Sequence, residues 1–445
     1  MKDPASPIYG CDAFWNTFWN LNQLWVLATP DIMNKWVESL LEYYRVGGWL
    51  PNGPPGVEYC DIMGAQHEIP LMVSAYQKGI RNYDVDKAYE AVKKTLTTQG
   101  TALSSGGIVG NRHLDVYLKY GFVPYGEKSH HNVFGTTYEG PTSNTLEYAF
   151  DDWNAAQFAK ALGYEEDYDY FTRRAYNYKN VFDSETKYVR PKYSDGTWMP
   201  DFEPINKDEH STSWSWLGSG FVEGNSWQYT WMVPHYMNEL VKMIGREEFN
   251  RRLNEGFEIS SEYSFSPPGD RFSAAYVNHG NQPCMQAAFL FNYSGKPWLT
   301  QYWAREMMNK YYGSTPIHGW PGDEDQGQGG AWFVMAAMGL FEVNGGGCVE
   351  PFYEISSPLF EKVTIHLDEK YYKGGKFVIE AKNVSNENRY IQSAKLNGKK
   401  LSKPWFYHSE LVNGGELELI MGKKPNYKWG SRPQDAPPSM SSNTQ

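Results

Sequence analysis

An acidic segment flanked by glycines carries the densest set of potentially catalytic groups in this sequence. Residues 322–328 read GDEDQGQ and place Asp323, Glu324 and Asp325 directly before the apolar stretch AWFVMAAMGLF. Carboxylates this close raise one another's pKa, so the segment needs a cation, a proton or a catalytic role. Three interpretations stay open: a calcium loop that lacks the EF-hand spacing, a general base, or acidic capping of the following helix.

A second run, FVEGNSWQY, combines one acid with amides and aromatic rings. It places Glu223 close to Asn225, Trp227 and Gln228. A glutamate beside aromatic rings can have the raised pKa that a general acid needs. The alternative is a solvated loop acid next to a core tryptophan.

A third run, NHGNQPCMQ, opens another expected helix. Asn281 can cap that helix through its side-chain oxygen, which explains its presence without any ligand. Gln282 and Gln286 then share one helix face, because residues four apart are neighbours on a helix. Capping does not account for these two amides or for His279, so they remain available for a ligand.

Composition and missing motifs exclude several classes of protein. The chain has 41 basic and 52 acidic residues, and the resulting charge of −11 argues against non-specific binding to nucleic acid. No apolar run reaches the length of a transmembrane helix, and the four cysteines form no CxxC pair. HExxH, GxSxG, Walker A and GxGxxG motifs are absent, which disfavours zinc proteases, α/β-hydrolases, P-loop NTPases and Rossmann enzymes.

Helices joined by long loops rich in glycine and aromatic residues are predicted over residues 1–355. About eleven helices are expected, mostly in adjacent pairs, and this arrangement favours an α/α toroid whose loops form a cleft at one end. Asp84 is expected to cap one helix. Asn144 and Glu147 are expected to form a capping box at the start of another helix, which ends before Gly163.

A change of pattern marks the C-terminal part. The segments KVTIHL, KFVIEAK, YIQSAKL and LELIMG alternate apolar and polar residues, and Asn397-Gly398 is a hairpin signal. Residues 356–430 are therefore predicted to form a small antiparallel β lobe. The tail, residues 431–445, is rich in proline and serine and is expected to be disordered.

These motifs, in this order, resemble glycoside hydrolase family 92, the calcium-dependent exo-α-mannosidases. EGNSWQY resembles the family's EGNxWQY, and GDEDQGQGGAW resembles its G-D/N-x-D-x-G-x-x-x-A-W box. Further matches are AFLFNYSGKPWLTQ at 288–301, YEISSPLFEKVTIHL at 353–367 and YIQSAKLNG at 390–398. The resemblance implies an inverting hydrolase that releases terminal mannose from oligosaccharides or glycoprotein glycans.

The resemblance also implies roles for individual residues. Glu223 would be the general acid, and Asp325 or Asp323 would be the base that activates water. In an inverting enzyme such carboxyl groups lie ~6.5–9.5 Å apart. The residues expected to contact substrate are Trp15, Asn16, Trp227, Asn281 and Gln282.

Calcium, location and partners follow from the same resemblance. Neutral amides of Asn225, Gln228 and Gln286 are the expected side-chain ligands of Ca²⁺, with backbone carbonyls and waters completing the shell. The family fold is an N-terminal β-sandwich followed by an (α/α)6 barrel, so the resemblance implies an (α/α)6 toroid over residues 1–355 and a β-sandwich that is expected as a separate segment. Members are secreted or periplasmic, although no signal peptide is seen in this sequence.

Three departures from the family pattern keep a second hypothesis open. The family's GNEPS box has Gln282 in place of glutamate, which predicts a linkage other than α-1,2. Its W-D-T-F-R motif has Asn16 and Trp19 in place of the aspartate and the arginine. The alternative is a non-catalytic carbohydrate-binding or assembly protein on a decayed glycosidase scaffold.

Overall fold

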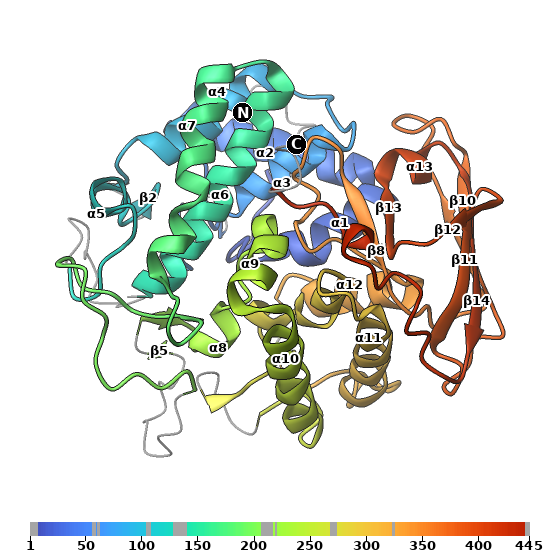
Figure 1. The fold of residues 1–445 in the computed structure, drawn as a ribbon. Helices are drawn as coiled ribbons and strands as arrows, with labels where there is room; N and C mark the ends of the chain where they lie inside the picture. The colour runs from blue at the N-terminus through green and yellow to red at the C-terminus, as the bar shows by residue number, and fades with distance from the viewer. Residues whose placement is uncertain are drawn as a thin grey trace.

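The computed structural model describes residues 8–55, 59, 63–103, 108–127, 140–205, 217–218, 220–267, 274–322 and 325–440. A helical body makes up most of the molecule, and a sheet built from the C-terminal part lies along one side of it (Figure 1). The helices of the body are α1 (Leu21–Ala28), α2 (Pro30–Gly47), α3 (Glu68–Gln77), α4 (Val85–Thr97), α5 (Leu114–Tyr120), α6 (Pro141–Leu162), α7 (Glu165–Ala175), α8 (Ser226–Tyr229), α9 (Met237–Ile244), α10 (Arg246–Ser261), α11 (Pro297–Tyr311) and α12 (Gln328–Met338). The mainly α prediction is confirmed for this body.

The central helix of the body is α6. Every residue from Pro141 to Ala159 is buried, and the helix packs against α3, α4 and α7. A helix that is buried on all sides must place any charged residue it carries inside the protein. Asp152 is such a residue, and its carboxylate pairs with the guanidinium of Arg174 at 2.7 Å.

Two predicted helix ends are confirmed and one predicted start is wrong. Asp84 accepts the backbone N–H of Lys87 at 2.9 Å, and Gly163 ends α6 with a left-handed φ of 81°. The start of α6, however, lies at Pro141, because proline suits the first helical position. Asn144 and Glu147 therefore lie inside the helix and cannot form the expected capping box.

Two predicted helices are also interrupted. The segment expected as one helix over 226–244 consists of α8, the 3-10 turn η3 (Pro234–Tyr236) and α9. Pro234 disfavours helical backbone at the residue before it, which explains the break. The segment after Asn281 forms two 3-10 turns, η5 (Gln282–Cys284) and η6 (Ala287–Asn292), in place of an α-helix.

The C-terminal sheet has five strands in the order β12-β11-β14-β10-β9. Their bounds are β9 (Lys362–His366), β10 (Lys376–Lys382), β11 (Tyr390–Leu396), β12 (Lys399–Leu401) and β14 (Gly415–Gly422). The hairpin at Asn397-Gly398 joins β11 to β12 as predicted. The purely antiparallel prediction is wrong for one pair, because β14 runs parallel to β10. The long connection between these strands, which includes helix α13 (His408–Val412), permits a parallel pairing.

A second, three-stranded sheet links the helical body to the lobe. It orders β13 (Trp405–Tyr407), β8 (Phe352–Ile355) and β7 (Leu340–Phe341), and β7 follows directly after α12. The buried ion pair between Lys78 and Glu342 lies next to this sheet, with both side chains fully inaccessible to solvent. The helical body and the lobe therefore share one interior.

The tail that was expected to be disordered packs against the protein as far as residue 440. Pro433–Asp435 form the 3-10 turn η7, and the backbone oxygen of Asp435 accepts the indole N–H of Trp405 at 3.1 Å. Arg432 pairs with the carboxylate of Asp435 at 2.7 Å. These contacts offset the entropy of ordering a segment rich in proline, whose backbone is already restricted. Residues 441–445 lie outside the described part.

Candidate active site

Glu223 is held between a short hairpin and a short helix. The hairpin pairs β5 (Leu217–Gly218) with β6 (Phe221–Val222), and Asn225 caps α8 by accepting the N–H of Gln228 at 2.9 Å. The hydroxyl of Tyr229 donates to the carbonyl of Val222 at 2.7 Å. Glu223 itself is partly buried and has a φ of 46°. A left-handed glutamate is strained by about 1 kcal/mol or more, so the surrounding contacts must hold it in place.

Asp325 lies in a second strained turn, immediately before α12. Asp325, Gln326 and Gly327 all have positive φ, at 44°, 62° and 99°. The backbone carbonyl of Asp325 accepts the N–H of Gln328, the first residue of α12, at 3.2 Å. The N-cap residue of α12 is Gly327, which has no side chain to cap the helix. Asp323 and Glu324 lie outside the described residues.

Two consecutive residues connect these turns. The amide of Asn281 donates to the backbone carbonyl of Glu223 at 2.7 Å, and the amide of Gln282 donates to Oδ2 of Asp325. Both amide side chains are buried. A hydrogen bond to an ionised carboxylate is stronger than one between neutral groups, so Gln282 anchors the Asp325 side chain firmly. The two predicted catalytic residues are thus held by one dipeptide.

Trp15 and Asn16 come to the same region from the N-terminal part of the chain. The indole N–H of Trp15 donates to Oε1 of Glu147 at 2.8 Å, and the carbonyl of Trp15 accepts the amide of Gln328 at 3.2 Å. Asn16 has a φ of 57° and is buried, yet neither polar atom of its side chain has a partner among the described residues. The buried amide of Asn16 therefore has both a donor and an acceptor available for a hydroxyl group.

Glu147 is a site residue that the sequence prediction missed. It is fully buried on α6, and burial raises its pKa to about 8, with the negative charge of Glu223 adding to the effect and the bond from Trp15 opposing it. Glu147 is therefore a neutral acid at pH 7. Glu147 lies between apolar residues in the segment LEYAF, and this position is the sequence signal for a buried acid. The predicted capping box assigned Glu147 to the exposed start of a helix instead.

His279 lies two residues before Asn281 and packs among aromatic side chains. Its Nε2 contacts the hydroxyl of Tyr312 at 2.9 Å, and its ring packs edge-on against Trp332 at 4.2 Å. Burial lowers the pKa of His279 to about 3, so the ring is neutral. The histidine therefore acts as a packing and hydrogen-bonding residue at neutral pH and not as a charged group.

Trp227 is placed in the hydrophobic core, in contrast to the expectation that it contacts sugar. Its ring packs edge-on against Trp231 and Tyr276 at centroid distances of 5.5 and 5.4 Å. Gly256 leaves the space that the ring fills, because a Cβ there would overlap it. Only 1% of Trp227 is exposed, so core packing accounts for the ring.

The three amides expected to bind calcium differ in how well they fit that role. Asn225 uses its oxygen for the helix cap and its NH₂ for the carbonyl of Ala275 at 2.8 Å, so it has a structural role. Gln286 is fully buried, and neither of its amide atoms has a partner among the described residues. Gln228 donates to Ala275 and lies on α8, which packs against η5. Gln286 and Gln228 therefore fit a Ca²⁺ ligand set, whereas Asn225 fits poorly.

Within the described ranges, no cluster of carboxylate, imidazole or thiol groups forms an alternative metal site. No group of three or more His, Cys, Asp or Glu side chains there could hold a metal ion. Calcium accepts neutral amide and carbonyl oxygens together with water, so a shell built around Gln286 remains compatible with this cation.

Comparison with known proteins shows similarity to one family of hydrolases. The model of the glycosyl hydrolase family 92 catalytic domain matches residues 1–423. A secreted glycosidase of Arthroderma benhamiae is 29% identical over 96% of this chain and 56% of its own length. The chain thus spans about half the length of that relative.

Solved structures show the same similarity. An inverting family 92 mannosidase of Bacteroides thetaiotaomicron is 32% identical with a TM-score of 0.81, covering 97% of this chain and 55% of its own. A family 92 α-mannosidase of the same organism, solved in complex with mannoimidazole, is 30% identical with a TM-score of 0.82, covering 97% and 53%.

Proposed function

The chain belongs to glycoside hydrolase family 92, and from that membership we propose that it is the catalytic region of an exo-acting, inverting, calcium-dependent α-mannosidase. The observation that carries the proposal is the pair of hydrogen bonds from Asn281 to Glu223 and from Gln282 to Asp325. One dipeptide therefore contacts the backbone of Glu223 and the side chain of Asp325, which helps to fix the two residues relative to each other, as hydrolysis by an acid and a base requires. The substrate is the terminal mannose of an oligosaccharide or glycoprotein glycan.

The proposed reaction assigns one proton transfer to each acid. Glu223 protonates the glycosidic oxygen as the bond to the leaving sugar breaks. Asp325, with Asp323 as the second candidate, takes a proton from the water that attacks the opposite face of the ring. Calcium, when bound, would hold sugar hydroxyls and favour a distorted ring. Glu147 contributes a buried neutral acid next to Glu223.

The proposed architecture is an (α/α)6 toroid over residues 1–355 and a β lobe over 356–430. Consecutive helices that contact each other, such as α6 and α7 or α9 and α10, support this arrangement. A separate β-sandwich segment is the proposed partner. An exposed apolar loop before Asp325 supports it, because Ile317 is 87% exposed and Trp320 is 37% exposed.

The proposed location is outside the cytoplasm, and the name of the secreted fungal relative supports it. Among the described segments, no helix combines the length and apolarity needed to cross a membrane. The proposed linkage preference is for bonds other than α-1,2, since Gln282 offers a neutral amide where the family pattern has glutamate.

A non-catalytic carbohydrate-binding or assembly protein is the second candidate. Trp19 favours it: the residue is fully buried and its indole N–H donates to the carbonyl of Val343 at 2.8 Å. A position that the family uses for an arginine is thus a packing position here. Asn16 and Gln282 also favour the second candidate, because both are neutral residues at positions where the family pattern has an acid.

Hydrolysis of the four α-linked mannobiosides, with calcium and after chelation, separates the two functions. The enzyme hypothesis expects turnover that depends on calcium, and β-mannose as the first product seen by NMR. Binding of mannobiosides without turnover in the presence of calcium would favour the second candidate. Turnover that survives exhaustive chelation would remove calcium from the proposal while keeping the hydrolase.

A further inference from the structure

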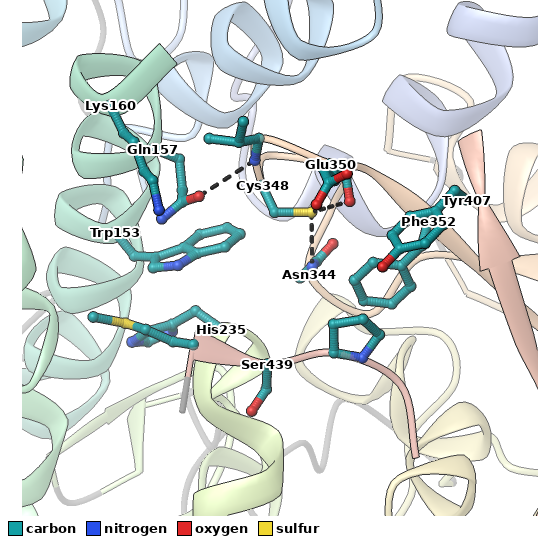
Figure 2. A pocket seen from close by; sticks show the side chains of 13 residues that line it. Trp153, Gln157, Lys160, His235, Asn344, Cys348, Glu350, Phe352, Tyr407 and Ser439 are labelled. Carbon is teal, nitrogen blue, oxygen red and sulfur yellow. Dashed lines mark hydrogen bonds between the residues drawn. The ribbon is translucent and has the colours of Figure 1, made fainter. Parts of the chain in front are cut away.

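A cavity of about 530 Å³ lies between the helical body and the C-terminal lobe (Figure 2). It involves none of the candidate active-site residues. Helix α6 runs from one region to the other, and Glu147 and Gln157 are ten residues apart, or about 15 Å along the helix. The lining of the cavity comes from α6, from η3, from the loop between β7 and β8, from β8 and β13, and from the tail as far as Met440.

Aromatic rings form two facing walls of the cavity. Trp153 lies on the α6 side, and Phe352 and Tyr407 lie across the open space from it (Figure 2). Aromatic faces suit ligands that present C–H groups on one side and polar groups at the edge, as sugar rings do.

Hydrogen bonds hold the loop of residues 344–350, which forms the upper wall of the cavity in Figure 2, in one conformation. The backbone N–H of Val349 donates to the side-chain oxygen of Gln157 at 3.3 Å. The amide of Asn344 donates to Sγ of Cys348 at 3.5 Å, and that thiol donates to the carbonyl of Glu350 at 3.2 Å. The wall is thus fixed from both sides, and a fixed wall lowers the entropy lost on binding.

The charge of the lining is balanced. Among the described lining residues, Lys160 supplies the one ammonium group and Glu350 the one carboxylate, and both are exposed. This balance disfavours phosphates and polyamines, which need an excess of one charge. The remaining lining mixes amides, a hydroxyl and rings, and the volume is in the range of small-molecule sites.

Two buried nitrogen atoms in the walls lack partners among the described residues, namely Nε1 of Trp153 and Nδ1 of His235. Nε2 of His235 contacts the carbonyl of Ala175 at 2.9 Å. Because a carbonyl only accepts, Nε2 carries the proton and Nδ1 is left as an acceptor. Trp153 offers only a donor, and the two ring centroids are 6.0 Å apart. A hydroxyl group both donates and accepts, so it can satisfy both nitrogens.

We propose that this cavity is a second binding site, separate from the catalytic region, for a neutral polyhydroxyl compound of monosaccharide or disaccharide size. The ligand stacks its C–H face against the aromatic walls, and its hydroxyl groups bond to the amides and to the two nitrogens. Both nitrogens are buried, so binding includes a shift of the side chains that separate them from the cavity.

The test measures binding of D-mannose and maltose to the Glu223→Gln chain by calorimetry, and locates each sugar by crystallography. Glucose 6-phosphate and 1-hexanol are the anionic and apolar comparison probes. Val349→Trp fills the cavity, and Val46→Trp is its matched control, because Val46 is an exposed valine on α2 far from the lining.

The proposal expects sugar in the cavity and a loss of affinity for maltose of about tenfold or more in Val349→Trp. Val46→Trp should bind as the parent does. Tyr407→Phe gives a second, milder variant in case the larger side chain prevents folding. Sugars found only near Glu223, equal binding by the two tryptophan variants, or binding of only the anionic or apolar probe would overturn the proposal.

Discussion

The side-chain amide of Gln282 donates a hydrogen bond to Oδ2 of Asp325. An amide can donate to a carboxylate, whereas an ionised glutamate cannot. The glutamine that departs from the family pattern therefore does more than alter the contact to a leaving sugar. It orients the residue proposed as general base, and a change at position 282 is expected to affect both linkage preference and the pH dependence of catalysis.

Gln282→Glu is expected to move the acidic limb of the pH profile of kcat/KM to higher pH. Two carboxyl groups in contact share a proton, so the base becomes fully ionised only at a higher pH. The loss at neutral pH should be about tenfold, the scale of one charged hydrogen bond. In the same assays, α-1,2-mannobiose should gain relative to the other linkages.

Gln282→Met is the matched control for that prediction. It removes the donor without adding a charge, so it should lower kcat/KM and move the acidic limb to higher pH by less than Gln282→Glu does, because only the hydrogen bond that favours the ionised carboxylate is lost. If both variants shift the limb equally, charge at position 282 is not the cause.

Glu223→Gln is expected to lower hydrolysis of mannobiosides by about 10² to 10⁴-fold, because the leaving oxygen is no longer protonated. A 4-nitrophenyl α-mannoside, whose leaving group needs little protonation, should lose much less. Glu203→Gln, at an exposed glutamate, is the control and should retain activity on both substrates. Equal losses on the two substrates in Glu223→Gln would count against its role as the acid.

Glu147 should make the protein less stable as pH rises from about 4.5 to about 8. Its pKa is raised from 4.5 to about 8 in the folded state. Over this interval the unfolded glutamate has lost its proton and the folded one keeps it, so unfolding becomes easier with increasing pH. Glu147→Gln removes this dependence. Between pH 4.5 and pH 8 the free energy of unfolding of the variant should therefore rise relative to that of the parent by about 4 to 5 kcal/mol.

Chemical denaturation of both proteins at several pH values measures that difference. Because other buried acids such as Glu354 titrate in the same range, the informative quantity is the variant minus the parent. Glu369→Gln, at an exposed glutamate, should give a constant difference. A constant difference for Glu147→Gln as well would show that Glu147 is ionised in the folded protein.

Lys78→Met should destabilise the protein by about 3–5 kcal/mol, because it leaves the fully buried Glu342 without its counter-ion. The double variant Lys78→Met with Glu342→Leu should recover much of this loss, since no unpaired charge remains. Lys87→Met breaks an exposed ion pair with Glu90 and should change stability by less than about 1 kcal/mol. A double variant as unstable as the single one would mean that packing, not charge, holds this interior together.

Local patterns in the sequence determined the parts of this protein that depend on near neighbours. The cap at Asp84, the helix end at Gly163 and the hairpin at Asn397 each follow from the conformational preferences of one or two residues. The period-two segments predicted the strands of the lobe for the same reason. The motif around Glu223 indicated the family, and the comparison with family models confirmed that resemblance.

Contacts between distant segments decided the rest. The sequence pattern predicted that Glu147 caps a helix and that Trp227 contacts substrate. In the structure, Glu147 is buried and accepts a hydrogen bond from Trp15, and Trp227 fills the space beside Gly256. Both partners are remote in sequence from the residues they contact. The parallel pairing of β14 with β10 likewise depends on how a long connection folds. A one-dimensional pattern does not specify which surfaces meet, so the bond between Gln282 and Asp325 became visible only in the tertiary structure.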